Sequence, residues 1–248
     1  MTSALTVAAI QYEALDGGVL ANVPEHVRHI EDAHSRGARL VVFPELSLTG
    51  YDLELYADEE AWVAPGDPRL ERIREIARRT GVTVIVGAGF REGDGTPRLA
   101  SLVIRPPGDA APAFKTHVHG AERELFVPGE GPALLELDGW RIALAICFDA
   151  AVPSHASSAA EAGADLYAVS AVYVQGEEHR LGLHLGARSM DNRMFGVLAN
   201  MGGSGAIGDS CGLSGAWGPD GRVLAQLDVS GSAIAIATLQ PEALLPFR

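Results

Sequence analysis

The sequence predicts an α/β fold with helices outside and sheets inside, and three observations support this prediction. Apolar runs of strand length outnumber the segments of helical periodicity. The helical segments fall into pairs between groups of strands, which is typical of layered folds. No linker, internal repeat or low-complexity tract divides the 248 residues. We therefore expect one domain over residues 1–248.

The N-terminal third alternates between strands and helices. Its predicted elements are strand 5–12, helix 22–38, a strand in the run 39–46 that is stopped by Pro44, helix 67–81 and strand 82–90. The first helix is predicted by Val23, Val27, Ile30 and Ala33, which recur at helical spacing. The second helix begins with Asp-Pro and ends at Gly81. The order of elements is therefore β-α-β-α-β.

The rest of the chain is richer in strands. We predict strands 98–105, 111–118, 133–139 and 140–148, helix 153–162, strand 165–171, helix 176–195 and strand 196–201. Three strand-like pieces at 212–218, 222–229 and 232–239 follow, separated by Pro-Asp-Gly and Ser-Gly turns. A short Asp-Gly turn joins strands 133–139 and 140–148, which predicts a hairpin.

Composition disfavours several classes of function. The formal charge of −13 argues against nucleic-acid partners, which are bound through clustered Lys and Arg. No apolar run reaches the ~18 residues that span a bilayer. The start of the sequence lacks the basic and long apolar regions of a signal peptide. Cys147 and Cys211 show no CxxC spacing, which fits a reducing compartment. We expect a cytoplasmic protein with no nucleic-acid or membrane partner.

Three residues with chemical potential stand in strands or at strand ends. Cys147 ends the apolar run WRIALAIC, where a thiol reaches the rim of a cleft; the alternative is a buried structural cysteine. Glu45 has apolar neighbours, so burial would raise its pKa toward that of a general base, unless it turns outward after Pro44. Lys115, in strand 111–118, either extends to solvent or stabilises an oxyanion beside a thiol. Placed together, the three would compensate one another's cost of burial.

The segments around these residues resemble a known family. LVVFPELSLTGY (40–51), FKTHVHGAERELFVPGEG (114–131) and LAICFDAAVP (144–153) are similar, in order and separation, to the three signature blocks of the nitrilase superfamily of carbon–nitrogen hydrolases. The similarity runs from Gln11 through ARSMDNR (187–193) to the closing strands. It implies a four-layer αββα sandwich, and a homodimer or higher homo-oligomer built through the helices after the nucleophile. It also implies chemistry without a metal or organic cofactor.

The resemblance assigns chemistry to individual residues. It implies that Glu45 is the general base, Lys115 the cation that stabilises the oxyanion, and Cys147 the nucleophile that forms a thioester. The backbone N–H of Phe148 is expected to bind the same oxyanion. A second carboxylate is expected at Glu122, with Glu124 as the alternative because the length of this loop varies in the family.

The residues after the nucleophile favour an amide substrate. Cys147-Phe148-Asp149 is similar to the Cys-aromatic-Asp pattern of amidase-like branches. Ala150-Ala151 replaces an Arg-containing stretch that many branches carry, which leaves recognition of a carboxylate there in doubt. We expect hydrolysis of a small, mostly linear carboxamide. A nitrilase, an N-carbamoyl amide hydrolase and a catalytically silent scaffold or subunit remain as alternatives.

The pocket walls are expected to come from aromatic residues and loops. Tyr51 and Tyr173 follow strand ends and are candidates, together with Phe148, to contact the substrate; each Tyr has a packing role as its alternative. The loops expected to determine specificity are 52–66, 118–130 and 172–180.

Other motifs have weaker interpretations. Residues 203–208 match G-x-G-x-x-G, but no helix follows, so we predict a flexible loop and no dinucleotide site. His117 and His119 share one face of the predicted strand 111–118 but lack a third ligand, so we expect no metal site. Arg188 and Asp191 are interpreted as a structural pair.

Overall fold

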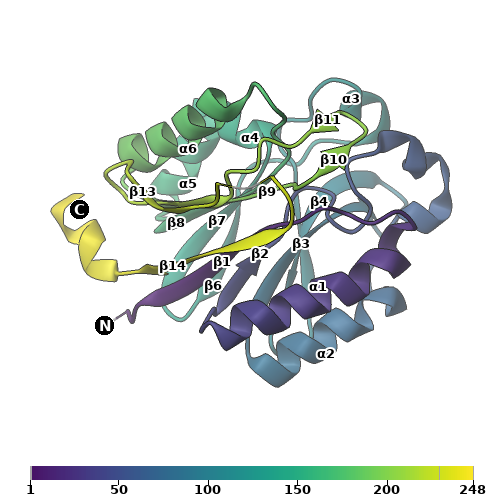
Figure 1. Ribbon diagram of the computed structural model, residues 1–248, viewed down its shortest axis with the longest axis horizontal. Helices are drawn as coiled ribbons and strands as arrows, with labels where there is room; N and C mark the ends of the chain where they lie inside the picture. The colour runs from purple at the N-terminus through teal and green to yellow at the C-terminus, as the bar shows by residue number, and fades with distance from the viewer. Residues whose placement is uncertain (1, 229, 248) are drawn as a thin grey trace.

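The polypeptide folds into four layers in the order helix, sheet, sheet, helix (Figure 1). The computed structural model describes residues 2–228 and 230–247. The outer layers are formed by α1 (Gly18–Ser35) with α2 (Glu71–Thr80), and by α5 (Pro153–Glu161) with α6 (Glu178–Asn192). The predicted four-layer αββα sandwich is therefore confirmed.

The first sheet contains six strands in the order β14-β1-β2-β3-β4-β5. Their bounds are β1 (Leu5–Gln11), β2 (Leu40–Val42), β3 (Thr83–Arg91), β4 (Pro97–Ile104), β5 (Ala110–Phe114) and β14 (Ala233–Leu239). β1, β2 and β3 are parallel, as the alternation with helices predicts. Because β4 pairs antiparallel with both β3 and β5, β5 runs in the same direction as β2.

The second sheet has the order β13-β12-β9-β8-β7-β6. Its strands are β6 (Ala133–Leu137), β7 (Trp140–Ile146), β8 (Leu166–Ala171), β9 (Phe195–Asn200), β12 (Gly215–Trp217) and β13 (Val223–Gln226). β6 and β7 form the predicted hairpin, and both turn residues, Asp138 and Gly139, have positive φ angles. This is the geometry of a two-residue turn that matches the strand twist.

Side-chain alternation along the strands builds the core. In β1, Val7 packs between the two sheets, whereas Ala8 packs beneath α1 and α2. In β7, Leu144 packs between the sheets and Ala145 packs beneath α5 and α6. In the second helical layer, α5 packs on its sheet through Ala156 and Ala159, and α6 packs on it through Leu181 and Leu185.

Short elements complete the chain. They are η1 (Leu53–Ala57), η2 (Glu59–Ala61), η3 (Pro68–Leu70), α3 (Glu122–Leu125), α4 (Phe148–Ala151), β10 (Ser204–Gly205), β11 (Gly208–Asp209) and η4 (Pro241–Phe247). In the described part of the chain, no helix is long and apolar enough to cross a membrane.

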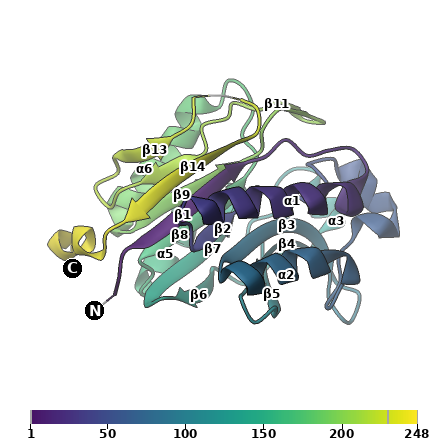
Figure 2. The same cartoon turned by 60° about the horizontal axis from the view of Figure 1, so that its bottom comes forward.

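Several predicted boundaries were wrong. α1 begins at Gly18 and not at residue 22, and α6 is shorter at both ends than the predicted helix 176–195. The loop predicted at 203–208 contains the hairpin of β10 and β11, which stands away from both large sheets (Figure 2). The strand predicted at 111–118 ends at Phe114, so Lys115 lies just beyond it. The last residue of the predicted strand 222–229 lies outside the described residues.

Candidate active site

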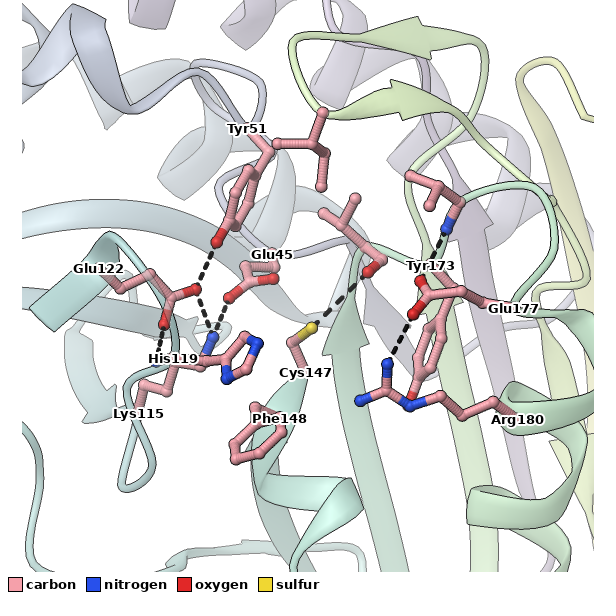
Figure 3. Close-up of a pocket in the computed structure, with 13 residues that line it drawn as sticks. Glu45, Tyr51, Lys115, His119, Glu122, Cys147, Phe148, Tyr173, Glu177 and Arg180 are labelled. Atoms are coloured by element: carbon pink, nitrogen blue, oxygen red, sulfur yellow. Dashed lines mark hydrogen bonds and ion pairs between the residues drawn. The ribbon is translucent and has the colours of Figure 1, made fainter.

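Three strand ends bring the predicted catalytic residues to one place. Glu45 follows β2 by three residues, Lys115 directly follows β5, and Cys147 directly follows β7. Since β2 and β5 run in the same direction, their carboxyl ends reach the same edge of the first sheet. Figure 3 shows the three side chains converging, with Glu122 of α3 on the opposite side of Lys115 from Cys147.

The backbone around Glu45 is held against β3. A Cβ atom at Gly87 would lie 2.3 Å from the Pro44 carbonyl oxygen and 2.4 Å from the Leu46 nitrogen, so only glycine allows this approach. Leu46 adopts a φ of 51°, which is uncommon for a residue with a side chain. The Gly87 N–H donates to Ser47 Oγ at 3.1 Å, which adds a second attachment.

A buried histidine continues this attachment. His26 Nδ1 lies 2.8 Å from the carbonyl oxygen of Asn22, and its Nε2 lies 2.9 Å from Ser47 Oγ. Burial lowers the pKa of His26 to about 3, so the ring is neutral. Because a carbonyl oxygen only accepts, Nδ1 carries the hydrogen and Nε2 accepts from the Ser47 hydroxyl. That hydroxyl oxygen is then oriented to accept from Gly87.

Lys115 is the only lysine in the sequence, and its side chain is 1% exposed. Its Nζ donates to Oε1 of Glu45 and to Oε1 of Glu122, each at 2.6 Å. Burial alone would lower the pKa of Lys115, but the adjacent negative charge of Glu45, with Glu122, raises it above the ordinary value. The site therefore holds a permanent ammonium group.

Glu45 is fully buried, with one oxygen paired and one free. Burial raises the pKa of Glu45 to about 7, against the opposing effect of the Lys115 charge. Its Oε2 has no hydrogen-bond partner among the described residues and lies on the side of Cys147 (Figure 3). A carboxyl group with this pKa and a free oxygen is suited to accept and return a proton near neutral pH.

Cys147 occupies a strained turn between β7 and α4. Its φ of 47° and ψ of −99° are rare for a residue with a side chain, and such strain costs on the order of 1–3 kcal/mol. Its N–H donates to the Ser170 carbonyl oxygen at 2.9 Å, and its Sγ lies 3.7 Å from the Val172 carbonyl oxygen. Burial and the nearby Glu45 charge raise the pKa of the Cys147 thiol, so the resting thiol is protonated. A base is needed to activate it.

Glu122, and not Glu124, is the second carboxylate that contacts Lys115. Besides the lysine, Glu122 Oε1 accepts from the Tyr51 hydroxyl at 2.6 Å, and Oε2 accepts from the His119 N–H at 2.8 Å. Glu122 is 1% exposed, whereas Glu124 faces solvent. Glu122 therefore lies behind Lys115, with all its bonds to residues of the site.

A small cavity opens in front of these residues. Its volume is about 240 Å³, and its lining comprises Glu45, Tyr51, Lys115, His119, Glu122, Cys147, Phe148, Val172, Tyr173, Val174, Glu177, Arg180 and Ile207. All seven site residues predicted from the sequence belong to this lining. The Phe148 ring stacks on His119 at a centroid distance of 4.3 Å, and the Tyr173 hydroxyl is hydrogen-bonded with His184 at 2.9 Å. The aromatic groups are thus fixed walls.

Part of the lining was not predicted. Glu177 and Arg180 form an ion pair of 2.6 Å at the side of the cavity opposite Lys115 (Figure 3). They lie in or next to the loop 172–180 that was expected to determine specificity, but no motif marked them individually. Ile207 comes from the β10–β11 hairpin, which was not expected near the site. Residues 52–66 contribute no lining side chain, contrary to expectation.

His117 and His119 do not share one face of a strand, contrary to the prediction from the sequence. Both lie beyond the end of β5, and the His117 Nδ1 donates to Asp149 Oδ1 at 2.8 Å. Among the residues that the structure describes, no group of three His, Cys, Asp or Glu side chains is placed to hold a metal ion. Arg188 donates to the carbonyl oxygens of Ala150 and Ala151 and so stabilises the end of α4.

The chain is similar in sequence to known proteins. The sequence model of the carbon–nitrogen hydrolase family matches residues 6–248. The "Hydrolase in pqqF 5′region" of Pseudomonas protegens is 33% identical over 207 residues, covering 82% of this chain and 72% of that protein. A nitrilase of Pyrococcus abyssi is 32% identical over 174 residues, covering 69% of this chain and 65% of its own length.

A solved structure is similar over the whole chain. The amidase of Nesterenkonia AN1, from the nitrilase superfamily, superposes with a TM-score of 0.87 at 26% identity, covering 100% of this chain and 95% of that chain. Its other solved forms include a complex with acrylamide and one showing covalent addition of the acetamide moiety of fluoroacetamide at the active-site cysteine. With the family model matching nearly every residue, the chain belongs to the carbon–nitrogen hydrolase family of the nitrilase superfamily.

Proposed function

We propose that this protein hydrolyses the C–N bond of a small carboxamide through a thioester on Cys147. The observation that carries the proposal is the position of a partly exposed, protonated thiol beside the buried ionic cluster of Glu45, Lys115 and Glu122. Each element of acyl transfer is present: a nucleophile, a base with a pKa near 7, and a fixed cation.

In the first half of the proposed reaction, Glu45 accepts the thiol proton while Cys147 Sγ attacks the carbonyl carbon. The electron pair of the carbonyl moves to its oxygen, where the Lys115 ammonium and the Phe148 N–H stabilise the charge. Phe148 is the first residue of α4, so its N–H has no acceptor within that helix. Collapse of the adduct breaks the C–N bond, and ammonia leaves with the proton that Glu45 returns.

In the second half, water completes the cycle. Glu45 accepts a proton from water, the resulting hydroxide attacks the thioester carbonyl carbon, and the C–S bond breaks. The Cys147 thiolate regains its proton from Glu45, and the carboxylic acid is released. The sum is one amide and one water converted to one acid and one ammonia.

The cavity supports a small substrate. About 240 Å³ lies below the ≈300–1,000 Å³ that is usual for sites of drug-sized ligands. The acrylamide and butyramide complexes of the Nesterenkonia amidase, with the Phe148-Asp149 sequence of this chain, favour short carboxamides. The similarity to the Pyrococcus abyssi protein keeps a nitrile as the second candidate substrate.

The test is ammonia release from a panel of acetamide, butyramide and acrylamide, with the matching nitriles and N-carbamoyl compounds in parallel. We expect turnover of amides, and a mass increase on Cys147 that matches the acyl group when the reaction is quenched. Cys147→Ala should abolish both signals, whereas Cys211→Ala should retain them. Turnover of nitriles alone would show that the substrate is a nitrile and not an amide. Absence of turnover, with equal and slow alkylation of Cys147 and Cys211, would indicate a catalytically silent scaffold.

We further propose a cytoplasmic homodimer formed through the outer face of α5 and α6. Leu183 and Met190 of α6 are 55% and 46% exposed, which leaves apolar surface for a second copy. Light scattering in solution tests the assembly, because a mass near the 26.0 kDa of one chain would exclude the dimer.

A further inference from the structure

Asp149 is a buried carboxylate that does not line the cavity. It lies two residues after Cys147 and is 1% exposed. Its oxygens accept from the backbone N–H groups of Ile146 at 3.0 Å, His117 at 2.8 Å and Thr116 at 3.4 Å, and from His117 Nδ1 at 2.8 Å. A buried carboxylate with this many donors is held in one orientation.

The donors belong to two separate segments. Ile146 ends β7 in the second sheet and precedes Cys147, whereas Thr116 and His117 follow Lys115 at the end of β5 in the first sheet. The carboxylate of Asp149 therefore joins the segment of the nucleophile to the segment of the lysine. It does so within two residues of each.

The ends of the strands explain why this carboxylate is required. The Cys147 N–H points to β8, where it donates to Ser170, so the N–H of the preceding Ile146 points to the β6 side. β6 pairs with β7 only as far as Ala133 opposite Leu144. Beyond that pair, Asp149 replaces the missing strand as the acceptor for Ile146.

The strained turn makes the attachment important. A positive φ at a residue with a side chain persists only when its surroundings hold it. Ser170 holds the Cys147 N–H, Arg188 holds the carbonyl oxygens at the end of α4, and Asp149 holds the residue before the turn. Of these three, only Asp149 also contacts the lysine segment.

We propose that Asp149, with His117 as its partner, is a positioning residue that sets the Cys147 thiol against the Lys115 ammonium group. The expected effect of Asp149 on amide turnover rests on the proposed function. The expected effect on the position and reactivity of the Cys147 thiol does not. We call the hydrogen bonds of Asp149 to Ile146, Thr116 and His117 the clamp. Without the clamp, the two strand ends are free to separate. A misplacement of about 1 Å in an active site costs roughly 100-fold in rate.

The main experiment compares Asp149→Asn with the wild type. The amide keeps the size of the side chain but directs an NH₂ group toward backbone donors. We expect kcat for amide hydrolysis to fall about 100-fold, with KM changed less than twofold because Asp149 does not reach the cavity. Asp109→Asn, at an exposed position between β4 and β5, is the matched control and should leave kcat unchanged. A normal kcat in Asp149→Asn, even with a lower Tm, would overturn the proposal.

A second measurement does not depend on amide turnover. The rate at which iodoacetamide alkylates Cys147 is measured in the wild type, Asp149→Asn, Lys115→Gln and the double variant. We expect each single variant to slow alkylation, and the double variant to be no slower than the slower single one, because Asp149 acts through the placement of Lys115. Fully multiplicative effects would overturn the proposal. If the two substitutions have coupled effects on alkylation but the wild type hydrolyses no amide, the positioning role of Asp149 is retained and the proposed function is rejected.

His117 provides a variant with less risk to folding. His117→Phe removes the side-chain donor to Asp149 but keeps the backbone N–H bond, so we expect a smaller loss of kcat in the same direction. His117→Asn places an amide donor near the position of Nδ1 and should restore part of that loss. Equal activity of His117→Phe and the wild type would contradict the role of the clamp.

Discussion

Lys115 Nζ lies 2.6 Å from Glu45 Oε1, and the two side chains are 1% and 0% exposed. The pair is not isolated, because Glu122 approaches the same ammonium at the same distance. Two carboxylates therefore share one cation in a region that solvent barely reaches. Such a cluster strongly constrains its lysine, since removing one partner of a buried pair costs about 3–5 kcal/mol.

The first prediction concerns replacement of Lys115. Lys115→Gln should lower the free energy of unfolding by about 3–5 kcal/mol and reduce kcat roughly 100-fold to 1,000-fold, as expected when an oxyanion donor is lost. Lys115→Arg should not restore activity, because the planar guanidinium does not fit the space of a compact ammonium. Urea unfolding and ammonia release check these values. Arg222→Gln, at a highly exposed position, carries the same charge change and should match the wild type in both.

The second prediction is a pH dependence set by Glu45. Because burial raises the pKa of Glu45 to about 7, the base is mostly protonated at pH 6 and mostly ionised at pH 8. We expect kcat/KM to rise with pH through a midpoint near 7. Lys115 favours the ionised form, so the midpoint should move upward in Lys115→Gln. A midpoint near 4.5, the ordinary value for a Glu, would contradict the rise in the pKa of Glu45 through burial.

The same shift affects stability. The folded protein holds the Glu45 proton more tightly than the unfolded chain, whose ordinary pKa is 4.5. The stabilisation that this proton provides is complete below pH 4.5 and is lost as pH rises to about 7. In Glu45→Gln, which cannot ionise, this contribution to the pH dependence of the free energy of unfolding should disappear. Equal slopes between pH 5 and 7 in the variant and the wild type would contradict the assignment.

Much of the site was predictable because its residues stand in three segments that resemble the signature blocks of a known family, whereas strand ends alone left Cys147, Glu45 and Lys115 with other interpretations. Apolar runs that stop at Glu45 and Cys147 predict strands whose next residues lie at a sheet edge, and the structure has them there. The identity of Glu122 was less certain from the sequence, because the choice over Glu124 depends on which side of a one-turn helix faces Lys115. No pattern within four residues resolves that choice.

The features that the sequence did not predict depend on contacts between segments that lie far apart in the sequence. Strand pairing was expected to continue to residue 118, but the N–H groups of Thr116 and His117 turn to Asp149 in α4, which follows β7 of the other sheet, and β5 stops. Asp149 was interpreted only as part of a subfamily pattern. Likewise, Ile207 reaches the cavity because the β10–β11 hairpin folds back beside it. Local periodicity contains no information on either contact.

The third prediction separates the two candidate carboxylates. Glu122→Gln leaves Lys115 with one fewer negative partner and weakens the bond from the Tyr51 hydroxyl, so we expect kcat to fall by at least 10-fold, in line with the ~1.5–3 kcal/mol of a hydrogen bond to a charged group. Glu124→Gln changes an exposed side chain two residues away and is the matched control. Steady-state kinetics of both variants on the same amide decide the matter. If Glu124→Gln were the slower enzyme, the placement of Glu122 behind Lys115 would have no functional meaning.

The fourth prediction tests the backbone support of Glu45. In Gly87→Ala the new Cβ meets the backbone of Pro44, Glu45 and Leu46 at 2.3–2.8 Å, where no flexible side chain can move aside. The segment that carries the base must shift, so we expect a loss of about 1–3 kcal/mol in stability from overpacking and a fall of about 100-fold in kcat. Gly182→Ala is the control, since a Cβ there meets no atom within 4 Å and alanine in a helix interior should stabilise by roughly 0.5–1 kcal/mol. Thermal unfolding measures the loss of stability, and kinetics measured below the Tm report on the position of Glu45. A lower Tm of Gly87→Ala with a normal kcat would mean that the fold is weakened but Glu45 is not displaced, which would contradict the prediction.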